Sequence, residues 1–270
     1  MFKFDSSFVT DVGKVRKNNE DNFYLNGVYK RVPEDLTYEK TELLYGDGVF
    51  AVCDGMGGEE YGEKASLLAV ETLKEFQNKD IDDVVDHYIE TVNTKICDFI
   101  NENNGTRSGT TLALLHIKNG LAISYNIGDS RVYLYRKGRL FQLSEDHTQT
   151  NQMIKMGILT KEKASLHKDR HVLTQHLGIF PDELIIQAYK SEIISIKNND
   201  IFLLCSDGLT DMLSGVEIES LLKNNASNKN CYNILKDAAL AKGGKDNITI
   251  GIVKVIGKKQ GILSDLWGKN

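Results

Sequence analysis

Residues 49–58 read Val49-Phe50-Ala51-Val52-Cys53-Asp54-Gly55-Met56-Gly57-Gly58, an apolar run that ends on a carboxylate followed by three glycines in four positions. Such a run predicts a buried strand, and the glycines allow the backbone to turn and to approach other groups closely. The strand therefore delivers the carboxylate of Asp54 to an open edge of the structure.

Two further segments combine a strand with an aspartate. Residues 201–208 read Ile201-Phe202-Leu203-Leu204-Cys205-Ser206-Asp207-Gly208, and the reverse order occurs where Lys245-Asp246-Asn247 leads into the apolar residues 248–253. Three aspartates at strand ends predict a metal site. An aspartate before glycine is also a common turn former, so this prediction depends on the three segments together.

Divalent cations would explain why these carboxylates gather. Without a cation, like charges within a few ångström raise one another's pKa. The three segments contain no histidine, and oxygen ligands favour Mg²⁺ or Mn²⁺ over zinc. Two such ions about 3.5 to 4 Å apart can share a carboxylate and a water, and they lower the pKa of that water until it is a nucleophile near neutral pH. The predicted chemistry is hydrolysis.

More acidic residues lie near the start of the chain, where Glu20 and Asp21 precede an apolar run. If both open the same strand, their side chains point to opposite faces, so only one can be a direct ligand. Arg16 lies four residues earlier; its planar guanidinium could grip a phosphate, or it could pair with a surface acid. Asp129 occupies another strand turn, in Asn126-Ile127-Gly128-Asp129-Ser130-Arg131.

Length and composition restrict the class of protein. The chain has 270 residues, 41% of them hydrophobic, and only two prolines, so it can bury a substantial core as one larger domain. Its formal net charge is -5. A chain with this charge lacks the basic stripe that neutralises nucleic-acid phosphates, so we do not expect a nucleic-acid partner.

The chain shows no sign of a membrane or secreted protein. Its first residues lack an apolar core of signal-peptide length, and no run approaches the ~20 apolar residues needed to cross a bilayer. The four cysteines are widely spaced without a C-x-x-C pair, which argues against a disulfide framework or a zinc knuckle. We therefore expect a cytoplasmic protein.

The apolar pattern predicts many strands, with tight connections at Asn119-Gly120, Lys137-Gly138 and 198–200 that leave no room for a helix. Strands joined in this way pair antiparallel. The predicted strands cover residues 2–10, 23–29, 49–54, 110–117, 121–127, 131–136, 140–143, 185–196, 201–205 and 248–256.

Helical periodicity occurs in two blocks between the runs of strands. Apolar residues follow i, i+3, i+4 spacing over 65–76 and 81–99, which predicts a helical hairpin. A second helical pair is expected over 215–224 and 230–241. Two sheets packed face to face with helices on their outer surfaces satisfy this order. The expected fold class is α+β, a four-layer α/β/β/α arrangement.

Three segments are expected outside this core. Residues 27–47 form a long polar stretch between strands, which predicts an insertion or mobile flap. Residues 145–177, with short helical pieces near 149–156 and 160–165, form a second excursion. A single domain is thus expected over 1–256. In the tail, 257–270, Ile262, Leu263, Leu266 and Trp267 have helical spacing and predict a docked terminal turn.

Several segments resemble known functional motifs but lack a residue or a context that the motif requires. Residues 57–64 have Glu63 where a phosphate-binding P-loop needs lysine. The run 80–84 imitates an aspartyl-phosphate motif but follows a polar segment, so a helix start is preferred. His167 and His171 have i, i+4 spacing but lack the usual glutamate of a zinc pair. His147 is either a proton donor or an ordinary loop histidine.

The ordered motifs resemble those of the bacterial type 2C (PPM family) metal-dependent serine/threonine protein phosphatases. The resemblance covers about 8–255. Besides the segments already quoted, it includes Ser108-Gly109-Thr110-Thr111. It implies a β-sandwich flanked by helix pairs, with a dinuclear Mn²⁺ or Mg²⁺ centre between the sheets. The excursion over 145–177 matches the flap of this family.

Roles of individual residues follow only from the resemblance. Asp54 would bridge two ions, Asp207 and Asp246 would hold the first, and Glu20 with the carbonyl of Gly55 would serve the second. Asp21 would then lie behind the direct ligands, Arg16 would orient the substrate phosphate, and Asp129 with Asp207 would match a third, weaker metal position. Met56 stands where many eukaryotic relatives have histidine, which leaves the general acid unassigned.

The resulting hypothesis is hydrolysis of phosphoserine and phosphothreonine monoesters on proteins by water activated at two metal ions. A serine/threonine kinase and its substrates are the implied partners, and we expect a monomer. Two alternatives are a phosphoprotein-binding module without activity and a binuclear-metal hydrolase of nucleotides or small phosphate esters.

Overall fold

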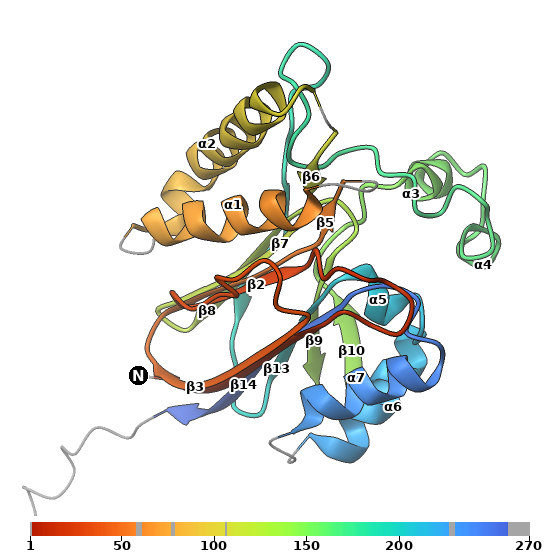
Figure 1. Cartoon of the computed structure of the whole chain (residues 1–270). Helices are drawn as coiled ribbons and strands as arrows, with labels where there is room; N and C mark the ends of the chain where they lie inside the picture. Colours follow the sequence, from red (N-terminus) through yellow and green to blue (C-terminus); the bar gives the residue numbers. More distant parts are fainter. Residues whose placement is uncertain (1, 58–60, 77–78, 106, 227–229, 259–270) are drawn as a thin grey trace, which may run out of the picture.

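The computed structural model describes residues 2–57, 61–76, 79–105, 107–226 and 230–258 (Figure 1). The terminal turn predicted from Ile262, Leu263, Leu266 and Trp267 lies outside these residues. In the described ranges, no helix is both long and apolar enough to cross a bilayer.

The first sheet has six antiparallel strands in the order β10-β9-β13-β14-β1-β3. Strand β1 lies between β14 and β3, and its pairing with β14 runs from Phe2 opposite Lys258 to Asp11 opposite Ile248. The strands are β1 Phe2–Asp11, β3 Thr37–Tyr45, β9 Arg131–Arg136, β10 Arg139–Gln142, β13 Ile201–Cys205 and β14 Ile248–Lys258.

The second sheet follows the order β11-β8-β7-β4-β2, and β12 also pairs with β8. A separate two-stranded ribbon, β5 with β6, extends beyond the end of β4. The strands are β2 Asn22–Leu25, β4 Gly48–Cys53, β5 Gly55–Met56, β6 Gly109–Thr110, β7 Leu112–Lys118, β8 Leu121–Ile127, β11 Tyr189–Lys190 and β12 Ile194–Ser195.

Aromatic side chains fill the space between the two sheets. The ring of Phe8, from the first sheet, lies 5.3 Å from Phe23 and 6.2 Å from Phe50 of the second, centroid to centroid. Strand β13 shows how both faces are used, because Phe202 packs in this inner layer and Leu203 in the outer one. Because successive side chains of a strand point to opposite faces, β13 contributes to both cores.

Helices cover the outer faces of both sheets, which completes the four layers (Figure 1). The hairpin of α1 and α2 packs on the second sheet, and α5, α6 and α7 pack on the first. Helices α3 and α4 project to one side in the flap (Figure 1). The helices are α1 Gly62–Glu75, α2 Ile81–Glu102, α3 Gln149–Lys155, α4 Lys161–Ala164, α5 Asp207–Thr210, α6 Gly215–Asn225 and α7 Cys231–Ala241.

The predicted α+β fold with antiparallel sheets and flanking helices is confirmed, with local differences. The segment 27–47 was expected as an insertion between strands, but it contains β3, which pairs with β1 and forms the edge of the first sheet. Both faces of β3 carry polar residues and neither is fully buried, so apolar alternation is weak there. The single strand predicted over 185–196 is two short strands, β11 and β12.

Candidate metal centre

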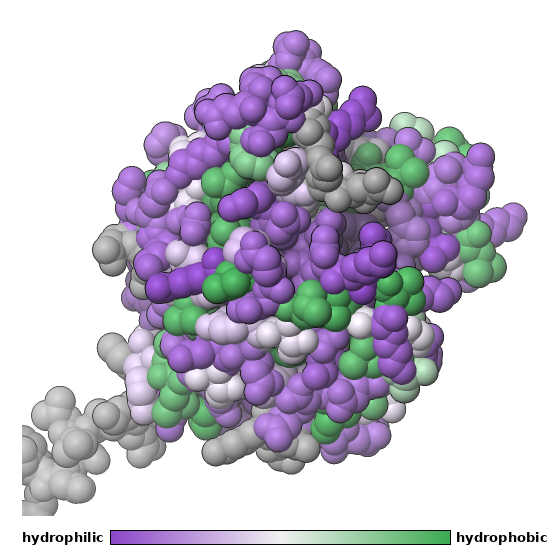
Figure 2. All heavy atoms as spheres, in the orientation of Figure 1, coloured by the Kyte–Doolittle hydropathy of each residue, from purple (hydrophilic) through white to green (hydrophobic). Residues whose placement is uncertain are grey.

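A cavity of about 460 Å³ lies at the ends of both sheets. The face drawn in Figure 2 is hollowed beside the flap, and hydrophilic residues surround the hollow. The lining residues are Arg16, Glu20, Asp54, Gly55, Met56, Gly57, Thr111, Asp129, His171, Leu173, Asp207, Asp211 and Asp246.

Strand ends position the acidic residues of this cavity. Asp54 directly follows β4, Asp207 begins α5 after β13, and Asp246 precedes β14. Asp129 lies in the turn from β8 to β9, and Glu20 lies just before β2. Because neighbouring strands are antiparallel, the end of one strand lies beside the start of the next. Carboxylates distant in sequence therefore meet at one end of the sandwich.

The main chain of Asp54 is held by two threonines. Its N–H donates to Thr111 Oγ1 at 3.0 Å, and its carbonyl accepts from Thr110 Oγ1 at 3.0 Å and from the N–H of Thr111 at 2.9 Å. The hydroxyls of Thr111 and Ser130 lie 2.6 Å apart, next to Asp129. Sequence reasoning included both threonines only in a motif and gave them no role.

The glycines after the first two aspartates are required by close packing. A Cβ atom on Gly55 would lie 2.2 Å from the carbonyl oxygen of Gly62 and 2.5 Å from that of Glu20. A Cβ atom on Gly208 would lie 1.9 Å from the carbonyl oxygen of Asn247. Only glycine lets these backbones approach so closely.

The acidic side chains raise one another's pKa. Burial, and then the charges of Asp21 and Asp207, raise the pKa of Asp54 well above its usual value. Burial, and then the charge of Asp207, raise the pKa of Asp129 to about 8. The pKa of Glu20 is also raised, by burial first. The protein thus gathers carboxylates that are ionised together only if a cation compensates their charge.

Asp21 lies beneath the cavity and does not line it. Its Oδ2 accepts hydrogen bonds from Ser206 Oγ and Thr249 Oγ1, each at 2.7 Å, whereas its buried Oδ1 has no hydrogen-bond partner among the described residues. Burial raises the pKa of Asp21 to about 7. Its side chain thus connects β2 to the residue before Asp207 and to β14.

Arg16 reaches the cavity from the loop between β1 and β2. One of its terminal nitrogens donates to Asp246 Oδ2 at 2.7 Å, and the side chain is half exposed. This hydrogen bond raises the pKa of Arg16. A permanent positive charge therefore lies at the edge of the acidic cavity.

The flap adds a histidine that sequence reasoning considered only as half of a zinc pair. His171 Nδ1 lies 3.7 Å from Asp207 Oδ2, and its Nε2 lies 3.4 Å from Asp211 Oδ2. Ligand atoms of Asp129, His171 and Asp207 lie within 4.8 Å of one another. His167, the other half of the pair, lies near Asp169 instead.

Asp211 and His147 also belong to the surroundings of the cavity. Asp211 lies one helical turn after Asp207, so its i, i+4 spacing could have indicated a shared site. His147 Nδ1 accepts from the N–H of Gly128 at 3.2 Å and holds the turn before Asp129. Of the two interpretations left open for His147, this contact supports the ordinary loop histidine.

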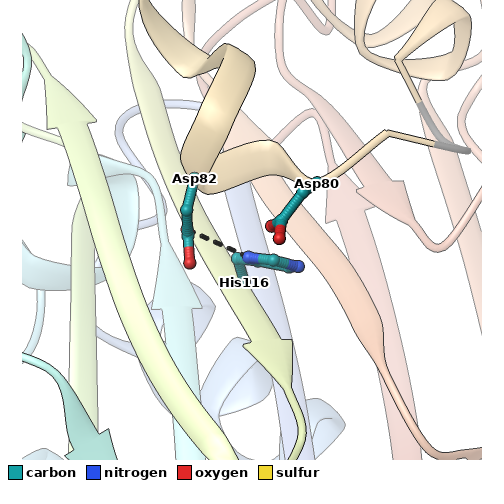
Figure 3. Close-up of side chains that lie close together, drawn as sticks. All are labelled: Asp80, Asp82 and His116. Carbon is teal, nitrogen blue, oxygen red and sulfur yellow. Dashed lines mark hydrogen bonds and ion pairs between the residues drawn. The ribbon is translucent and has the colours of Figure 1, made fainter.

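A second group of ligand-type side chains, Asp80, Asp82 and His116, lies at the start of α2 (Figure 3). His116 Nδ1 lies 3.0 Å from Asp82 Oδ1, which also accepts from the hydroxyl of Tyr125 at 3.1 Å. Asp80 pairs with the ammonium of Lys118. Because His116 and Tyr125 bind Asp82 and Lys118 binds Asp80, we interpret this cluster as a connection between α2 and the strands β7 and β8. The second oxygen of Asp80, Oδ1, is buried and has no hydrogen-bond partner among the described residues.

The main cavity fits hard divalent cations better than zinc. Carboxylate oxygens dominate its lining, and Arg16 and His171 are the nitrogen-bearing side chains there. Oxygen-rich sites of this kind suit Mg²⁺ and Mn²⁺. The raised pKa values of Asp54 and Asp129 are what such cations would reverse.

Comparisons with known proteins agree on one family. Residues 38–239 match the family model described as Protein phosphatase 2C. The protein phosphatase PhpP of Streptococcus pneumoniae is 35% identical over 256 residues, which cover 92% of this chain and 96% of PhpP.

Solved structures agree as well. The serine/threonine phosphatase Stp1 of Staphylococcus aureus superimposes with a TM-score of 0.80 at 26% identity, covering 93% of this chain and 95% of that one. The catalytic domain of PstP in complex with 2 manganese ions gives a TM-score of 0.76 at 26% identity, covering 95% of this chain and all (100%) of that one.

Proposed function

Because the chain belongs to the protein phosphatase 2C family, we propose that the cavity is its catalytic centre. The protein is a metal-dependent serine/threonine phosphatase that acts on phosphorylated proteins. The observation that carries the assignment of the site is the convergence of Glu20, Asp54, Asp129, Asp207 and Asp246, with Arg16, on one cavity.

Two Mn²⁺ or Mg²⁺ ions are proposed for this centre. Asp54 would contact both, Asp207 and Asp246 would hold the first, and Glu20 with the Gly55 carbonyl would serve the second. All five residues line the cavity, and the PstP relative carries 2 manganese ions. When bound, such a pair of ions lowers the pKa of a shared water so that it can act as a nucleophile near neutral pH.

Two further acidic residues have different proposed roles. Asp129, close to Asp207 and His171, would contribute to a weaker third position. Asp21 positions the centre without touching it, because its contacts are the hydroxyls of Ser206 and Thr249.

Arg16 would bind the substrate phosphate. A guanidinium carries five N–H donors, and the bond to Asp246 uses only part of them. It can therefore hold two phosphate oxygens at once while it stays anchored. None of the described cavity residues is a cysteine or serine, and the hydroxyl of Thr111 is engaged by Asp54 and Ser130. Water is thus the proposed nucleophile, without a phosphoenzyme.

The test compares purified wild type with Asp54→Asn and Asp207→Asn in Mn²⁺, using a phosphothreonine peptide and an aryl phosphate. We expect activity to fall by at least about 100-fold in both variants, and to vanish for the wild type in a chelator. Asp237→Asn is the control, because its side chain is 71% exposed on α7. Unchanged turnover in folded Asp54→Asn protein would exclude the proposed site.

Several finer assignments complete the proposal. The catalytic unit would be one domain over 1–256, with residues 145–177 as its flap, acting as a monomer. A serine/threonine kinase would be its antagonist, and the kinase and its substrates would be the clients. The four cysteines are free and buried, as is usual in a reducing compartment, which supports a cytoplasmic location.

A further inference from the structure

Two loops on one side of the cavity behave as a single unit. Residues 12–18 connect β1 to β2, and residues 242–247 connect α7 to β14; they lie side by side (Figure 1). The N–H of Lys14 donates to the carbonyl of Gly244 at 2.7 Å.

Asn247 fastens these loops at both ends. Its Nδ2 donates to the carbonyls of Val12 at 3.0 Å and Asn18 at 2.9 Å, and its Oδ1 accepts from the N–H of Glu20 at 2.8 Å. We call residues 12–18 and 242–246 the rim. Because hydrogen bonds from the buried Asn247 side chain hold it, the rim is a fixed wall beside the cavity.

The rim presents lysines that no acidic group neutralises. Lys14, Lys17 and Lys245 are exposed, and in the described part of the chain none of the three forms an ion pair. Lys14 and Lys17 flank Arg16, and Lys245 precedes Asp246, so all three are one or two residues from groups that line the cavity.

We propose that the rim binds carboxylates of the substrate, so that the enzyme prefers phosphosites flanked by Asp or Glu. This inference rests on the proposed function, in which divalent cations balance the acidic floor and Arg16 takes the phosphate. A peptide residue spans at most about 3.6 Å, so the positions next to the phosphoresidue meet the rim. The net charge of the whole chain is -5, which by itself would attract basic peptides and repel acidic ones, so the proposed preference depends on the rim.

The size of the effect follows from the exposure of these lysines. An exposed ion pair changes an equilibrium by about 1.5- to 5-fold, so three together give on the order of tenfold. Dissolved salt screens exposed ion pairs, and at 0.1 M salt the Debye length is about 10 Å. The preference should therefore be large at low ionic strength and small at high ionic strength.

The experiment uses phosphothreonine peptides that differ only in having aspartate, asparagine or lysine around the phosphoresidue. For the wild type with Mn²⁺ at low salt, we expect kcat/KM to be about tenfold higher for the aspartate peptide than for the lysine peptide. The triple variant K14E/K17E/K245E should reverse that ratio. The control K137E/K197E/K223E changes the net charge equally at exposed lysines that form no ion pair with any described residue, and it should keep the wild-type ratio.

Aryl phosphate turnover in each protein separates this inference from the proposed function. It reports on the centre without peptide flanks, so wild type that cleaves aryl phosphate while treating all peptides equally overturns the rim assignment alone. A preference that survives in the rim variant, or is lost equally in the control, also overturns it. If the rim variant does not fold, loss of the wild-type preference at high salt supports the inference, and a preference independent of salt contradicts it.

Discussion

Thr111 holds the main chain of Asp54, the central carboxylate of the proposed centre. Its hydroxyl accepts from the N–H of Asp54 and bonds to Ser130, so it fixes the turn that carries the central carboxylate relative to the turn that carries Asp129. In the described structure the Thr111 hydroxyl makes no hydrogen bond to an acidic side chain. Any effect of Thr111 on activity would therefore come from how it positions Asp54.

Replacement of Thr111 by valine should reduce activity without unfolding the protein. Valine has nearly the same shape but leaves the N–H of Asp54 and the hydroxyl of Ser130 without their partner. An unpaired buried donor costs about 1–3 kcal/mol, so we expect kcat/KM to fall by about tenfold to 100-fold in an aryl phosphate assay. Thr111→Ser keeps the hydroxyl and is the matched control; if it is as impaired as Thr111→Val, the hydrogen bond is not the cause.

At the scale of single elements, the cluster of Asp80, Asp82 and His116 connects α2 to the second sheet (Figure 3). The His116 side chain is only 5% exposed and bonds to Asp82. The cluster does not share a lining residue with the proposed catalytic cavity. Its contribution should therefore be to stability.

The variant His116→Leu tests this structural role. Loss of the bond to Asp82 should lower the free energy of unfolding by about 1–3 kcal/mol in urea denaturation, with kcat for aryl phosphate unchanged. His87→Leu, on the exposed face of α2, is the control, and there we expect a change within about 0.5 kcal/mol. If Zn²⁺ raised the midpoint of wild type but not of His116→Leu, a metal site would replace the structural interpretation.

Elements with strong local patterns could be predicted from the sequence, and elements defined by tertiary contacts could not. The apolar run 201–205 is buried on both faces, so it indicated β13 directly. The mixed residues of β3 gave no such pattern, because this strand forms by pairing with β1. The ribbon β5 with β6 and the short helix α5 are only two and four residues long, too short for periodicity to reveal.

The site shows the same division between local and tertiary information. The sequence indicated that Asp54, Asp207 and Asp246 lie together, because each adjoins a buried strand, and all three line the cavity. It could not place His171 beside Asp207 and Asp211, because that proximity depends on where the flap lies against α5. Nor could the sequence show that Asp21 turns toward Ser206 and Thr249, since those partners come from strands far along the chain.

At the scale of the whole molecule, the binding of protons or cations by the cavity carboxylates should change the stability of the fold. The pKa of Asp129 is raised to about 8 and that of Asp21 to about 7, and the pKa of Asp54 is raised as well, first of all by burial. Groups with raised folded-state pKa values bind more protons in the folded than in the unfolded chain. In a chelator, their stabilising effect is complete below about pH 4 and is lost as the pH rises toward 8.

Thermal unfolding should reveal this coupling. For the protein in a chelator, we expect the midpoint to fall between about pH 5 and pH 8. Saturating Mn²⁺ should raise the midpoint most at the upper end of this range, because ionised ligands bind cations and protonated ones do not. If the midpoint of thermal unfolding in a chelator rose steadily across the same pH range, the carboxylates of the cavity would not have raised pKa values in the folded protein.

The pairing of β1 with β14 also sets how the enzyme can be attached to other objects. Ile248 lies at the end of the sandwich that carries the cavity, two residues after Asp246, whereas Lys258 lies opposite Phe2 at the far end of the same strand pair. Ten residues of strand span about 33 Å. A bead, a fluorophore or a fused carrier attached at Lys258 would therefore start at the end of the sandwich opposite the cavity, and an immobilised enzyme should keep the proposed catalytic centre accessible to phosphorylated proteins.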